Sequence, residues 1–466
     1  MVKGSKKIPV AMTIAGSDSG GGAGIQADLK TFAALGVHGT TAITCITAQN
    51  TYSVTAIECV KPEIVKEQIR QVAEDMGIDA GKTGMLYTEE IIRAVSEEVS
   101  RHGFPLVVDP VMVAKYGAPL LKPEAENALK RLLLPLATVV TPNKFEAEKL
   151  IGREIRDVED AKKAAEEICS MGPRAVIVKG GHLNTPEEAI DVLYYKGESM
   201  IFRVPRAYAK TTHGTGCSFS AAITAFIAKG EDIPSAVKHA KDFITYAIKF
   251  GLEVGKGAGP VNPLAVLYRE AARYSVLKSV SEAKRILESS PHVASLVPEV
   301  GINVAMALPY AESIKDIAAI PGRLMRVFDN VRASSCPEFG ASSHLARYLL
   351  EIMKYDPSKR AAINIRFSED LLALLKEENF RISYYNREEE PEEIKRINGM
   401  TIPWGVKQAI MRINGIPDVI YHRGDLGKEP MIVIFGEDAA ALAEKIVKLS
   451  FKFTEKLDSS LTAARL

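Results

Sequence analysis

Cysteine is scarce in this sequence, and the few cysteines are not spaced as a structural framework. The 466 residues include five, namely Cys45, Cys59, Cys169, Cys217 and Cys336, with no C-x-x-C pair. An odd number of widely scattered cysteines argues against a disulfide framework and against a zinc ribbon. We therefore expect a reducing, cytoplasmic environment.

An excess of charge of one sign is also missing. The 59 Lys and Arg residues are balanced by 58 Asp and Glu residues, for a net charge of +1, so no global field draws the chain to nucleic acid or to an anionic membrane. No stretch of about 20 predominantly apolar residues occurs. Glycines and Asp18 interrupt the apolar run near the basic start too early for a secretion signal. We expect a soluble protein that binds small molecules, with no nucleic-acid or membrane partner.

Hydrophobic residues make up 47% of the chain, enough for more than one buried core. From residue 8 to about residue 250, short β-branched runs alternate with longer segments of helical period. This alternation predicts an α/β fold with a parallel sheet covered by helices. The predicted strands are IPVAMTIAG, TTAITCITA, DAGKTGML, PLVVDPVM, ATVVTPN, AVIVKGG and DVLYYK, and the predicted helices include PEIVKEQIRQVAEDM, TEEIIRAVSEEVSRH and VEDAKKAAEEICSMG.

A change of pattern predicts a domain boundary near residue 270. The glycine-rich segment 253–263 breaks the alternation, and a helical segment follows from about Pro263 to Glu288. We place a first domain at residues 1–268 and a second, smaller α/β domain at residues 269–466.

The first glycine cluster, GSDSGGGAGIQADLKTF from Gly16, does not fit the common nucleotide-binding motifs. Gly22-x-Gly24-x-x-Ala27 resembles a dinucleotide fingerprint, but that motif requires an acidic residue about 20 positions further on. None occurs between Asp28 and Glu58, and no G-x-x-x-x-G-K-[ST] loop exists in the chain. The glycines are suited to the close approach of a small ligand, and a flexible surface turn is the alternative.

The second glycine cluster, TTHGTGCSFSAAITAF, predicts an anion hole. Its Thr/Gly run at 211–216 leads directly into a helix of small and apolar residues, so unpaired backbone N–H groups converge at the start of the helix. Such donors stabilise a transferring phosphoryl group. Cys217 falls in the first turn, where we expect a lowered pKa and a role in accepting a proton from an attacking hydroxyl. A buried structural Cys is the alternative.

Seven motifs together resemble the hydroxymethylpyrimidine (phosphate) kinase family, ThiD, within the ribokinase-like three-layer α/β/α fold. They run from about Val10 to Pro263 and are AGSDSGGGAGIQADLKTF, TCITAQNT, KTGML, VVDPVM, TPNKFEAE, VKGGH and HGTGC. The resemblance implies two successive ATP-dependent phosphorylations that convert 4-amino-5-hydroxymethyl-2-methylpyrimidine first to its monophosphate and then to its diphosphate.

The resemblance also implies the residues of this site. An aminopyrimidine offers an amine donor beside a ring-nitrogen acceptor, which an amide side chain matches, and Gln49 stands at that position. The other implied pyrimidine contacts are Gly16, Asp28, Met85 and Val111.

ATP and Mg²⁺ are the implied cofactors. Asp109 and Glu146 match the magnesium region, Asn143 and Lys179 match nucleotide-phosphate positions, and Thr215, Gly216 and Cys217 match the anion hole. Many sugar kinases of the wider fold carry Asp where this chain has Cys217, and the Cys is shared with some pyridoxal kinases. A pyridoxal kinase is therefore the nearest alternative, against which Gln49 and the complete first glycine segment argue.

The second domain has a local pattern suited to binding diphosphate. Arg323 and Arg326 lie near an apparent strand, and PEFGASSHLARYLLEIM predicts a helix with Ser342 or Ser343 as N-cap and His344 in the first turn. Arginines, a histidine and a helix start form a plausible diphosphate cradle. The alternative is an ordinary cap with a surface histidine. The expected apolar face of the helix consists of Leu345, Tyr348, Leu349 and Ile352.

From about Val276 onward the chain resembles the ThiN-type thiamine-phosphate synthase domain. The matching stretches are VPEVGINVAMALPYA, PGRLMRV, CPEFGASSHLARYLL, IPWGVKQAI and PDVIYHRGDLGKEPMIVIFG. The resemblance implies Arg323 and His344 as the catalytic pair, with Ser343 and Lys428 as phosphate contacts.

The implied second reaction joins the pyrimidine diphosphate to 4-methyl-5-(2-phosphoethyl)thiazole, giving thiamine phosphate and pyrophosphate. Together the two halves predict a bifunctional enzyme of thiamine biosynthesis, which we expect to be a homo-oligomer. The alternative from another functional class is a kinase fused to a non-catalytic domain that senses thiamine phosphate. Near-neutral charge and the absence of a helix-turn-helix pattern argue against a DNA-binding regulator.

Overall fold

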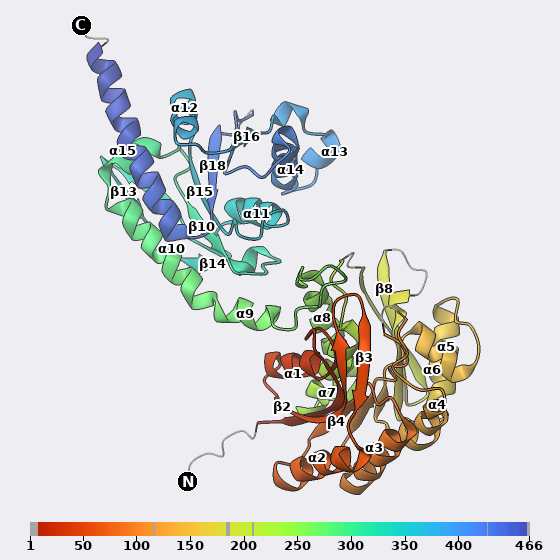
Figure 1. Ribbon diagram of the computed structural model, residues 1–466. Coiled ribbons are helices and arrows are strands. Elements are labelled where there is room, and N and C mark those ends of the chain that lie inside the picture. The colour runs from red at the N-terminus through yellow and green to blue at the C-terminus, as the bar shows by residue number, and fades with distance from the viewer. Residues whose placement is uncertain (1–7, 115–116, 183–186, 207–208, 426, 464–466) are drawn as a thin grey trace. The chain divides into compact units, whose positions relative to one another are not determined.

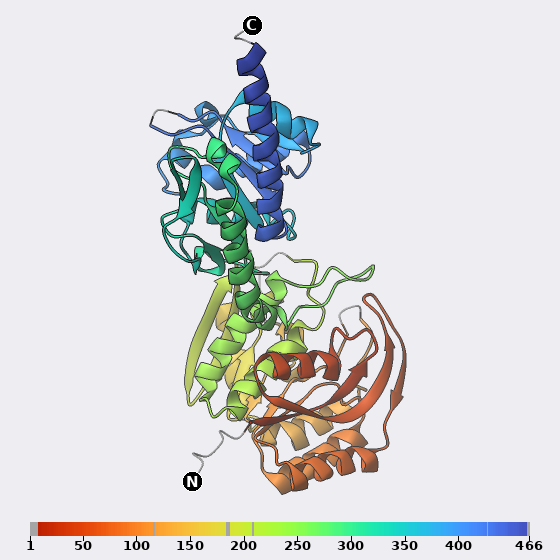
Figure 2. The same cartoon turned by 90° about the vertical axis from the view of Figure 1, so that its left-hand side faces the viewer.

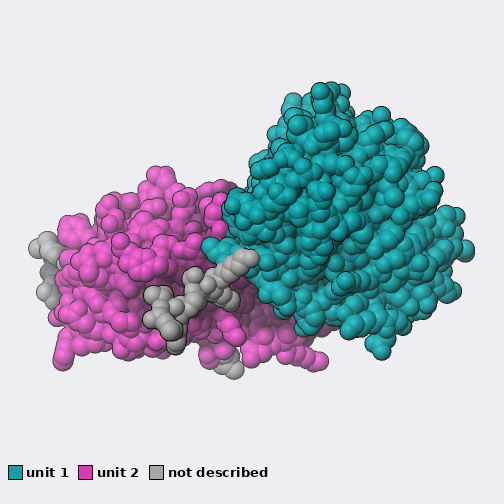
Figure 3. Space-filling model, turned by 90° about the horizontal axis from the view of Figure 1, so that it is seen from below, with its two compact units in different colours: residues 1–266 teal, residues 267–466 magenta. Residues whose placement is uncertain are grey.

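A computed structural model describes residues 8–114, 117–182, 187–206, 209–425 and 427–463. The chain forms two compact units, Met1–Val266 and Leu267–Leu466, which are coloured separately in Figure 3. Over the described ranges, every helix is too short or too polar to cross a membrane. The two units are described separately below.

The first unit is built on a nine-stranded sheet of order β3-β2-β1-β4-β5-β6-β7-β8-β9. The six strands from β2 to β7 in this order are parallel neighbours. Most of their side chains are buried on both faces, as expected of a sheet with helices on both sides. The strands are β1 (Val10–Asp18), β2 (His38–Gln49), β3 (Val54–Cys59), β4 (Ala80–Thr83), β5 (Leu106–Val108), β6 (Val139–Val140), β7 (Ala175–Val178), β8 (Glu188–Tyr195) and β9 (Glu198–Pro205).

Helices cover both faces of this sheet, so the predicted three-layer α/β/α architecture is confirmed (Figure 1). One face carries α1 (Gly24–Ala34), α7 (Thr215–Ala228) and α8 (Ile233–Lys249). The other face carries α2 (Pro62–Asp75), α3 (Glu89–His102), α4 (Ala125–Ala128), α5 (Lys144–Ile151) and α6 (Val158–Cys169). The three helices predicted at 62–76, 88–102 and 158–172 are present, within a few residues at their ends.

The edges of the sheet differ from the prediction of a purely parallel sheet. β3, β8 and β9 are antiparallel to their neighbours, and the pattern did not reveal β3 or β9. A tight turn at Lys196 and Gly197, both with positive φ, joins β8 to β9. A connection this short joins antiparallel strands, because a parallel pair requires a long crossover.

The second unit has a seven-stranded sheet of order β14-β11-β10-β15-β18-β17-β16. It is mostly antiparallel, and the described pairing that runs parallel joins β16 to β17. A separate hairpin pairs β12 (Leu324–Val327) with β13 (Asn330–Ala333). The sheet strands are β10 (Val304–Ala307), β11 (Ile317–Ala319), β14 (Glu338–Phe339), β15 (Ala361–Arg366), β16 (Ile382–Tyr384), β17 (Val419–His422) and β18 (Met431–Gly436).

Helices also cover both faces of this second sheet. The first face carries α10 (Arg273–Glu288), α12 (Glu369–Glu377) and α15 (Ala439–Ala463), of which α10 and α15 pack side by side (Figures 1 and 2). The second face carries α11 (Ser343–Ile352) and α14 (Thr401–Ile413), with the short α13 (Glu392–Lys395) beside α14. The predicted helical segment from Pro263 to Glu288 consists of two helices, α9 (Ala265–Ala271) and α10.

Candidate functional sites

A cavity of about 500 Å³ lies in the first unit, at the carboxyl ends of the parallel strands. This edge is where open α/β sheets bind ligands. The cavity brings together every predicted site residue of the first unit except Asp28. These lining residues are Gly16, Gln49, Met85, Asp109, Val111, Asn143, Glu146, Lys179, Thr215, Gly216 and Cys217.

The loop before α7 places the start of that helix in the cavity. α7 begins at Thr215, with Cys217 in its first turn, and Gly214 is the N-cap with a φ of 77°. A Cβ on Gly214 would lie 1.8 Å from the carbonyl oxygen of Gly22. Glycine is thus required here both by backbone conformation and by the packing of one glycine-rich loop against the other.

A lysine and an aspartate face the start of α7. Lys179 Nζ donates to Asp109 Oδ1 over 3.0 Å, and Thr141 Oγ1 donates to the same oxygen over 3.2 Å. A Cβ on Gly216 would lie 3.4 Å from Lys179 Nζ and 3.7 Å from Asp109 Oδ2. The absence of a side chain at Gly216 therefore leaves a short path from the helix start to this ion pair.

The second acidic residue of the cavity is held by a helix cap. Asn143 is the N-cap of α5, its Oδ1 accepts from the Glu146 N–H over 2.9 Å, and Glu146 Oε2 accepts from the Asn143 N–H over 2.8 Å. This reciprocal capping box fixes both side chains at the cavity wall. Burial, with a smaller contribution from the nearby Asp109 carboxylate, raises the pKa of Glu146 to about 7 against the opposing charge of Lys179.

The predicted lowering of the Cys217 pKa is wrong. Burial raises the pKa of this thiol to about 11, although the ammonium of Lys82 and a hydrogen bond from the Gly24 backbone act to lower it. The thiol is partly accessible from the cavity but is surrounded mostly by protein, so desolvation of a thiolate outweighs the effect of the helix start. Cys217 is thus a neutral thiol at pH 7.

Asp28 is not among the residues that line the cavity, and its role as a pyrimidine contact stays a prediction. Its carboxylate is fully buried, accepts from Thr13 Oγ1 over 2.6 Å and accepts from Lys82 Nζ over 3.0 and 3.1 Å. The contacts make Asp28 the residue that holds Lys82.

Lys82 is a site residue that sequence reasoning missed. It lies in β4, is fully buried and lines the cavity. Burial alone would lower the pKa of Lys82, but the carboxylate of Asp28 outweighs this and raises it, so the ammonium is retained. A lysine in the middle of the predicted buried strand DAGKTGML was the signal that would have found it, because buried lysines occur only with partners.

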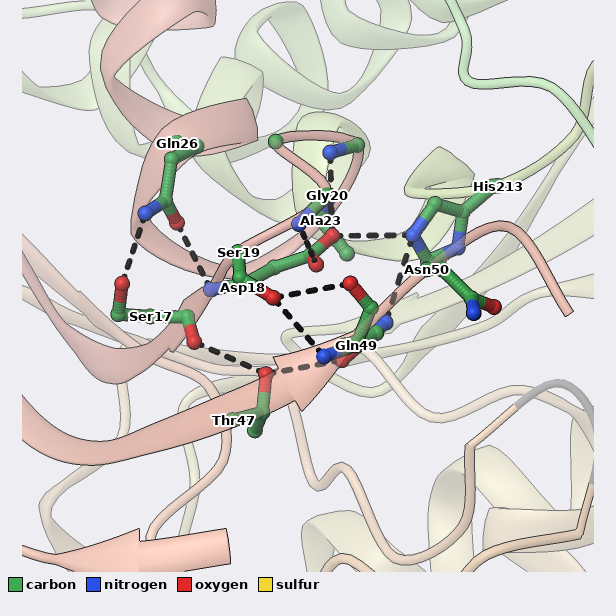
Figure 4. Close-up of polar contacts among 12 residues, drawn as sticks. Ser17, Asp18, Ser19, Gly20, Ala23, Gln26, Thr47, Gln49, Asn50 and His213 are labelled. Atoms are coloured by element: carbon green, nitrogen blue, oxygen red, sulfur yellow. Dashed lines mark hydrogen bonds and ion pairs between the residues drawn. The ribbon is translucent and has the colours of Figure 1, made fainter. Parts of the chain in front are cut away.

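Asp18 and His213 form a second missed group, which joins the two glycine-rich loops (Figure 4). Asp18 accepts from the backbone N–H groups of Gly20, Gly22 and Ala23 and lies 3.0 Å from His213 Nε2. Burial would raise the pKa of Asp18, but the hydrogen bonds from His213 and the backbone lower it. The carboxylate therefore shapes the first loop around itself.

Gln49 is held at the edge of the same group. Its Oε1 accepts from Thr47 Oγ1 over 3.2 Å, and its Nε2 lies 3.4 Å from His213 Nε2 (Figure 4). Its backbone N–H donates to Ser19 Oγ over 2.8 Å. The amide that was predicted to meet an aminopyrimidine is thus oriented by protein contacts at the cavity.

Glycines of the first cluster are required for close packing of the chain, and Gly16 and Gly24 also line the cavity. A Cβ on Gly22 would lie 2.3 Å from the ring of His213, and a Cβ on Gly24 would lie 2.3 Å from the Gly16 carbonyl oxygen. The alternative of a flexible surface turn does not fit such close contacts.

The second unit has its own cavity, of about 390 Å³. Arg323, His344 and Lys428 all line it, so the structure brings together three of the predicted residues. Ser342, rather than Ser343, caps α11 by accepting from the Leu345 N–H, and it lines the cavity. Ser343 is exposed and is not among the lining residues, so its role as a phosphate contact stays a prediction.

His344 has a strongly lowered pKa, and Arg323 has a rare backbone conformation. Burial lowers the pKa of His344 to about 4, and the charges of Arg323 and other cations lower it further. Arg323 has a φ of 65°, a left-handed conformation rare for a residue with a side chain, and its Nη1 donates to the Val300 carbonyl over 2.6 Å. Arg326 is exposed, donates to the Phe328 carbonyl and lies outside the cavity lining.

Sequence reasoning missed two further cations and a histidine of this cavity. Arg347, Arg387 and His422 line it together with the predicted residues. Burial lowers the pKa of His422 to about 4, with contributions from Arg387 and His344. The periodicity of α11 was a usable signal for Arg347, since it lies one turn after the N-terminal residues of the helix.

Family comparisons match both units. The family model "Phosphomethylpyrimidine kinase" matches residues 18–262, and "Thiamine-phosphate synthase ThiN" matches residues 279–448. The hydroxymethylpyrimidine/phosphomethylpyrimidine kinase of Bacillus subtilis is 47% identical over 256 residues, covering 55% of this chain and 94% of that protein. The thiamine biosynthesis bifunctional protein ThiED of Geobacter sulfurreducens is 46% identical over 252 residues, covering 54% of this chain and 51% of that protein.

A comparison with solved structures identifies the fold of the first unit. The Bacillus subtilis pyridoxal kinase in its ADP complex aligns with a TM-score of 0.52 and 39% identity, covering 56% of this chain and 99% of that one. The first unit therefore has a ribokinase-like kinase fold. With a phosphomethylpyrimidine kinase model over more than half its length and a ThiN model over most of the remainder, the chain belongs to the phosphomethylpyrimidine kinase family of thiamine biosynthesis and carries a ThiN domain.

Proposed function

We propose that the first unit phosphorylates 4-amino-5-hydroxymethyl-2-methylpyrimidine and then its monophosphate, with ATP as donor. The observation that carries this proposal is that Gln49 and the start of α7 line one cavity. The amide is matched to the aminopyrimidine, and the N–H groups at the start of the helix are matched to a phosphoryl group. One cavity can therefore hold both the acceptor and the group transferred to it.

The charges of the cavity suit phosphoryl transfer. The transition state is loose and spreads negative charge over the phosphoryl oxygens, so catalysis depends on positioning and on fixed positive groups. Lys179 and Lys82 both line the cavity, and each is held by a buried carboxylate. Cys217 is a neutral thiol at pH 7. We therefore infer that it positions the attacking hydroxyl by hydrogen bonding and does not act as a thiolate general base.

The donor set fits a magnesium ion carried by nucleotide phosphates. Where the structure describes the chain, no group of three or more His, Cys, Asp or Glu side chains is arranged to hold a metal. Asp109 and Glu146 supply two carboxylates in one cavity, and Mg²⁺ is commonly bound by one or two carboxylates together with phosphates and water. Bound there, the ion would neutralise phosphate charge.

A pair of variants tests the role of Cys217. Cys217→Ala removes the polar group, and we expect a fall in kcat of about 10²-fold or more, since loss of a positioning contact costs this much. Cys217→Ser keeps a hydrogen-bonding group, and we expect it to retain kcat within about tenfold. Initial rates with the pyrimidine and ATP decide. A Ser variant as inactive as the Ala variant contradicts the positioning role and favours a thiolate base.

Pyridoxal is a second candidate substrate of the first unit, because the aligned solved structure is a pyridoxal kinase at 39% identity. Pyridoxal also presents a hydroxymethyl group on a nitrogen heterocycle. We expect a higher kcat/KM for the aminopyrimidine, since Gln49 pairs with both of its polar groups. Replacing Gln49 by Leu should lower the rate on the pyrimidine more than the rate on pyridoxal.

We further propose that the second unit joins the pyrimidine diphosphate to 4-methyl-5-(2-phosphoethyl)thiazole, releasing pyrophosphate and giving thiamine phosphate. The observation that carries this proposal is the gathering of Arg323, His344, Arg347, Arg387 and Lys428 around one cavity. Both substrates carry phosphates, so an excess of cations suits them.

The chemistry requires stabilisation of a leaving group. When pyrophosphate departs from the exocyclic carbon, the amino group of the pyrimidine delocalises the positive charge left behind. Arg323 and its neighbouring cations would stabilise the negative charge on pyrophosphate. His344 is neutral before binding, and the arrival of an anion raises its pKa, so a proton taken up there adds to this stabilisation.

The second proposal is tested on the intact protein by supplying the pyrimidine diphosphate and the thiazole phosphate directly. We expect equimolar thiamine phosphate and pyrophosphate, without ATP. Binding of thiamine phosphate with no turnover would contradict the proposal and identify the unit as a sensor. The product of the first unit is the substrate of the second, so their fusion fixes equal amounts of both activities.

A further inference from the structure

Two of the five cysteines lie together in the fold, although the sequence separates them. Cys45 is in β2 and Cys59 is in β3, and the two residues are direct partners in the antiparallel ladder. Their Sγ atoms are 3.0 Å apart, and the residues are 14 positions apart in the chain. The strand β3 was not predicted, so this pairing was invisible in the spacing of the cysteines.

The pair has the geometry that a cross-strand disulfide requires. The neighbouring partners Thr44 and Val60 are joined by a backbone hydrogen bond of 2.9 Å from the Val60 N–H, which makes Cys45 and Cys59 a non-hydrogen-bonded pair. Such pairs have Cα atoms about 4.5 Å apart, within the range of disulfides, and an S–S bond of about 2.05 Å is reached from the present distance by closing about 1 Å. We propose that Cys45 and Cys59 form an intramolecular disulfide when the folded protein meets a small disulfide oxidant.

The exposure of the two sulfurs sets the order of the reaction. Cys59 is half-buried and Cys45 is fully buried, so the Cys59 thiol loses its proton and attacks the oxidant, forming a mixed disulfide and releasing one thiol. Cys45 then loses its proton and attacks the Cys59 sulfur, releasing the second thiol. The two protein thiols lose two electrons and two protons, and the oxidant gains them as two thiols, so the exchange balances.

The burial of Cys45 does not prevent the second step. Burial raises the pKa of Cys45, but the remaining upward contributions come mainly from the hydrogen bond and charge of Cys59 itself. Once Cys59 is in a mixed disulfide, it carries no thiolate charge, and the activated sulfur is adjacent to Cys45.

The bond would fix the strand that carries Gln49 to the cavity. Cys45 lies four residues before Gln49 in β2. The turn that follows β2 is already held by hydrogen bonds to Thr51. There, the Gly257 N–H donates to Thr51 Oγ1 over 3.0 Å, and the Ala258 N–H donates to the Thr51 carbonyl over 3.1 Å. A Cys45–Cys59 bond would hold the other end, so the hairpin would be fixed at both ends.

The test is oxidation of the intact protein with oxidised glutathione after full reduction and desalting. We expect two of the five thiols to disappear when thiols are titrated in denaturant, and peptide mapping to find residues 45 and 59 in one linked pair. The first unit should show an upward shift in Tm of roughly 6–12 °C, because closing a loop of this length restricts the unfolded chain.

Four single variants complete the test. Cys45→Ala and Cys59→Ser should abolish both the loss of thiols in pairs and the Tm shift, whereas Cys169→Ser and Cys336→Ser should leave both unchanged. The proposal is overturned if all five thiols remain, if glutathione stays attached at Cys59, or if the linked peptides contain another cysteine. Retention of the Tm shift in the Cys59→Ser variant would equally reject it.

Discussion

The two cavities differ in how their positive charges are balanced. In the first unit, Lys82 pairs with Asp28, Lys179 pairs with Asp109, and Lys241 pairs with Asp191 over 2.6 Å. In the second unit, Arg323 donates to a backbone carbonyl, and Arg387 lies 3.8 Å from a carboxylate oxygen of Asp425 and 4.0 Å from one of Glu390. The first site supplies its own counter-charges, whereas the second retains positive charge for its phosphate-bearing substrates to balance.

We expect the largest effect on stability when one partner of the buried Lys82–Asp28 ion pair is removed. Lys82→Met leaves the Asp28 carboxylate buried without its partner, which costs about 3–5 kcal/mol of folding free energy. Urea unfolding followed by far-ultraviolet circular dichroism measures the cost, since Lys82 lines the cavity and its loss would also change the activity directly. The double variant Lys82→Met/Asp28→Asn removes both charges and should recover part of the stability. If Lys82→Met is as stable as the parent, the Lys82–Asp28 ion pair does not contribute to the free energy of unfolding.

The next largest effect is expected on the synthase rate, when an arginine that lines the second cavity is removed. Arg323→Ala should lower kcat for thiamine phosphate formation by about 10²–10³-fold, since one preorganised donor to a developing anion is worth that much. Kinase activity should stay at its parent value. The matched control is Arg326→Ala, which removes an exposed arginine outside the cavity lining and should leave both rates unchanged. An equal fall in the kcat for thiamine phosphate formation in both variants would contradict the assignment of Arg323 to the active site.

Acid should affect the second unit through its two neutral histidines. The pKa of His422 is lowered to about 4 by burial, against about 6.5 in an unfolded chain. The unfolded state therefore binds the proton first, and the stability from this group is present above pH 6.5 and falls as the pH drops towards 4. The expected loss is up to about 3 kcal/mol for His422.

Denaturant unfolding of the second unit at pH 7 and pH 4.5 measures this loss, with tyrosine and tryptophan fluorescence as the signal. His422→Gln should flatten the pH dependence relative to the parent, because Gln has no proton to gain. A parent and variant with parallel curves would mean that His422 titrates normally.

Local sequence patterns predicted the helix starts of both sites. Cys217 follows a Thr/Gly run that ends directly at α7, and His344 follows the Ser342 cap of α11. Each of these placements depends on a few consecutive residues, so a single sequence is enough to predict them. The order of motifs along the first unit likewise indicated the layered fold.

Features that depend on packing between distant segments were not predictable in this way. Asp28 and Lys82 are 54 positions apart, and their pairing requires α1 to pack on β1, which is the neighbour of β4 in the sheet. The raised pKa of Cys217 follows from desolvation by the surrounding protein, with contributions from the carboxylates of Asp28 and Asp109, and not from its place on α7. The pairing of Cys45 with Cys59 depends on the register of β3, an edge strand without a clear alternating pattern.

The most direct measurement uses the purified full chain with the hydroxymethylpyrimidine, ATP, Mg²⁺ and the thiazole phosphate in one reaction. The account predicts thiamine phosphate and pyrophosphate, with two ATP consumed for each thiamine phosphate formed. Accumulation of the pyrimidine diphosphate without thiamine phosphate would contradict the assignment of the second cavity, and recovery of unphosphorylated pyrimidine would contradict that of the first.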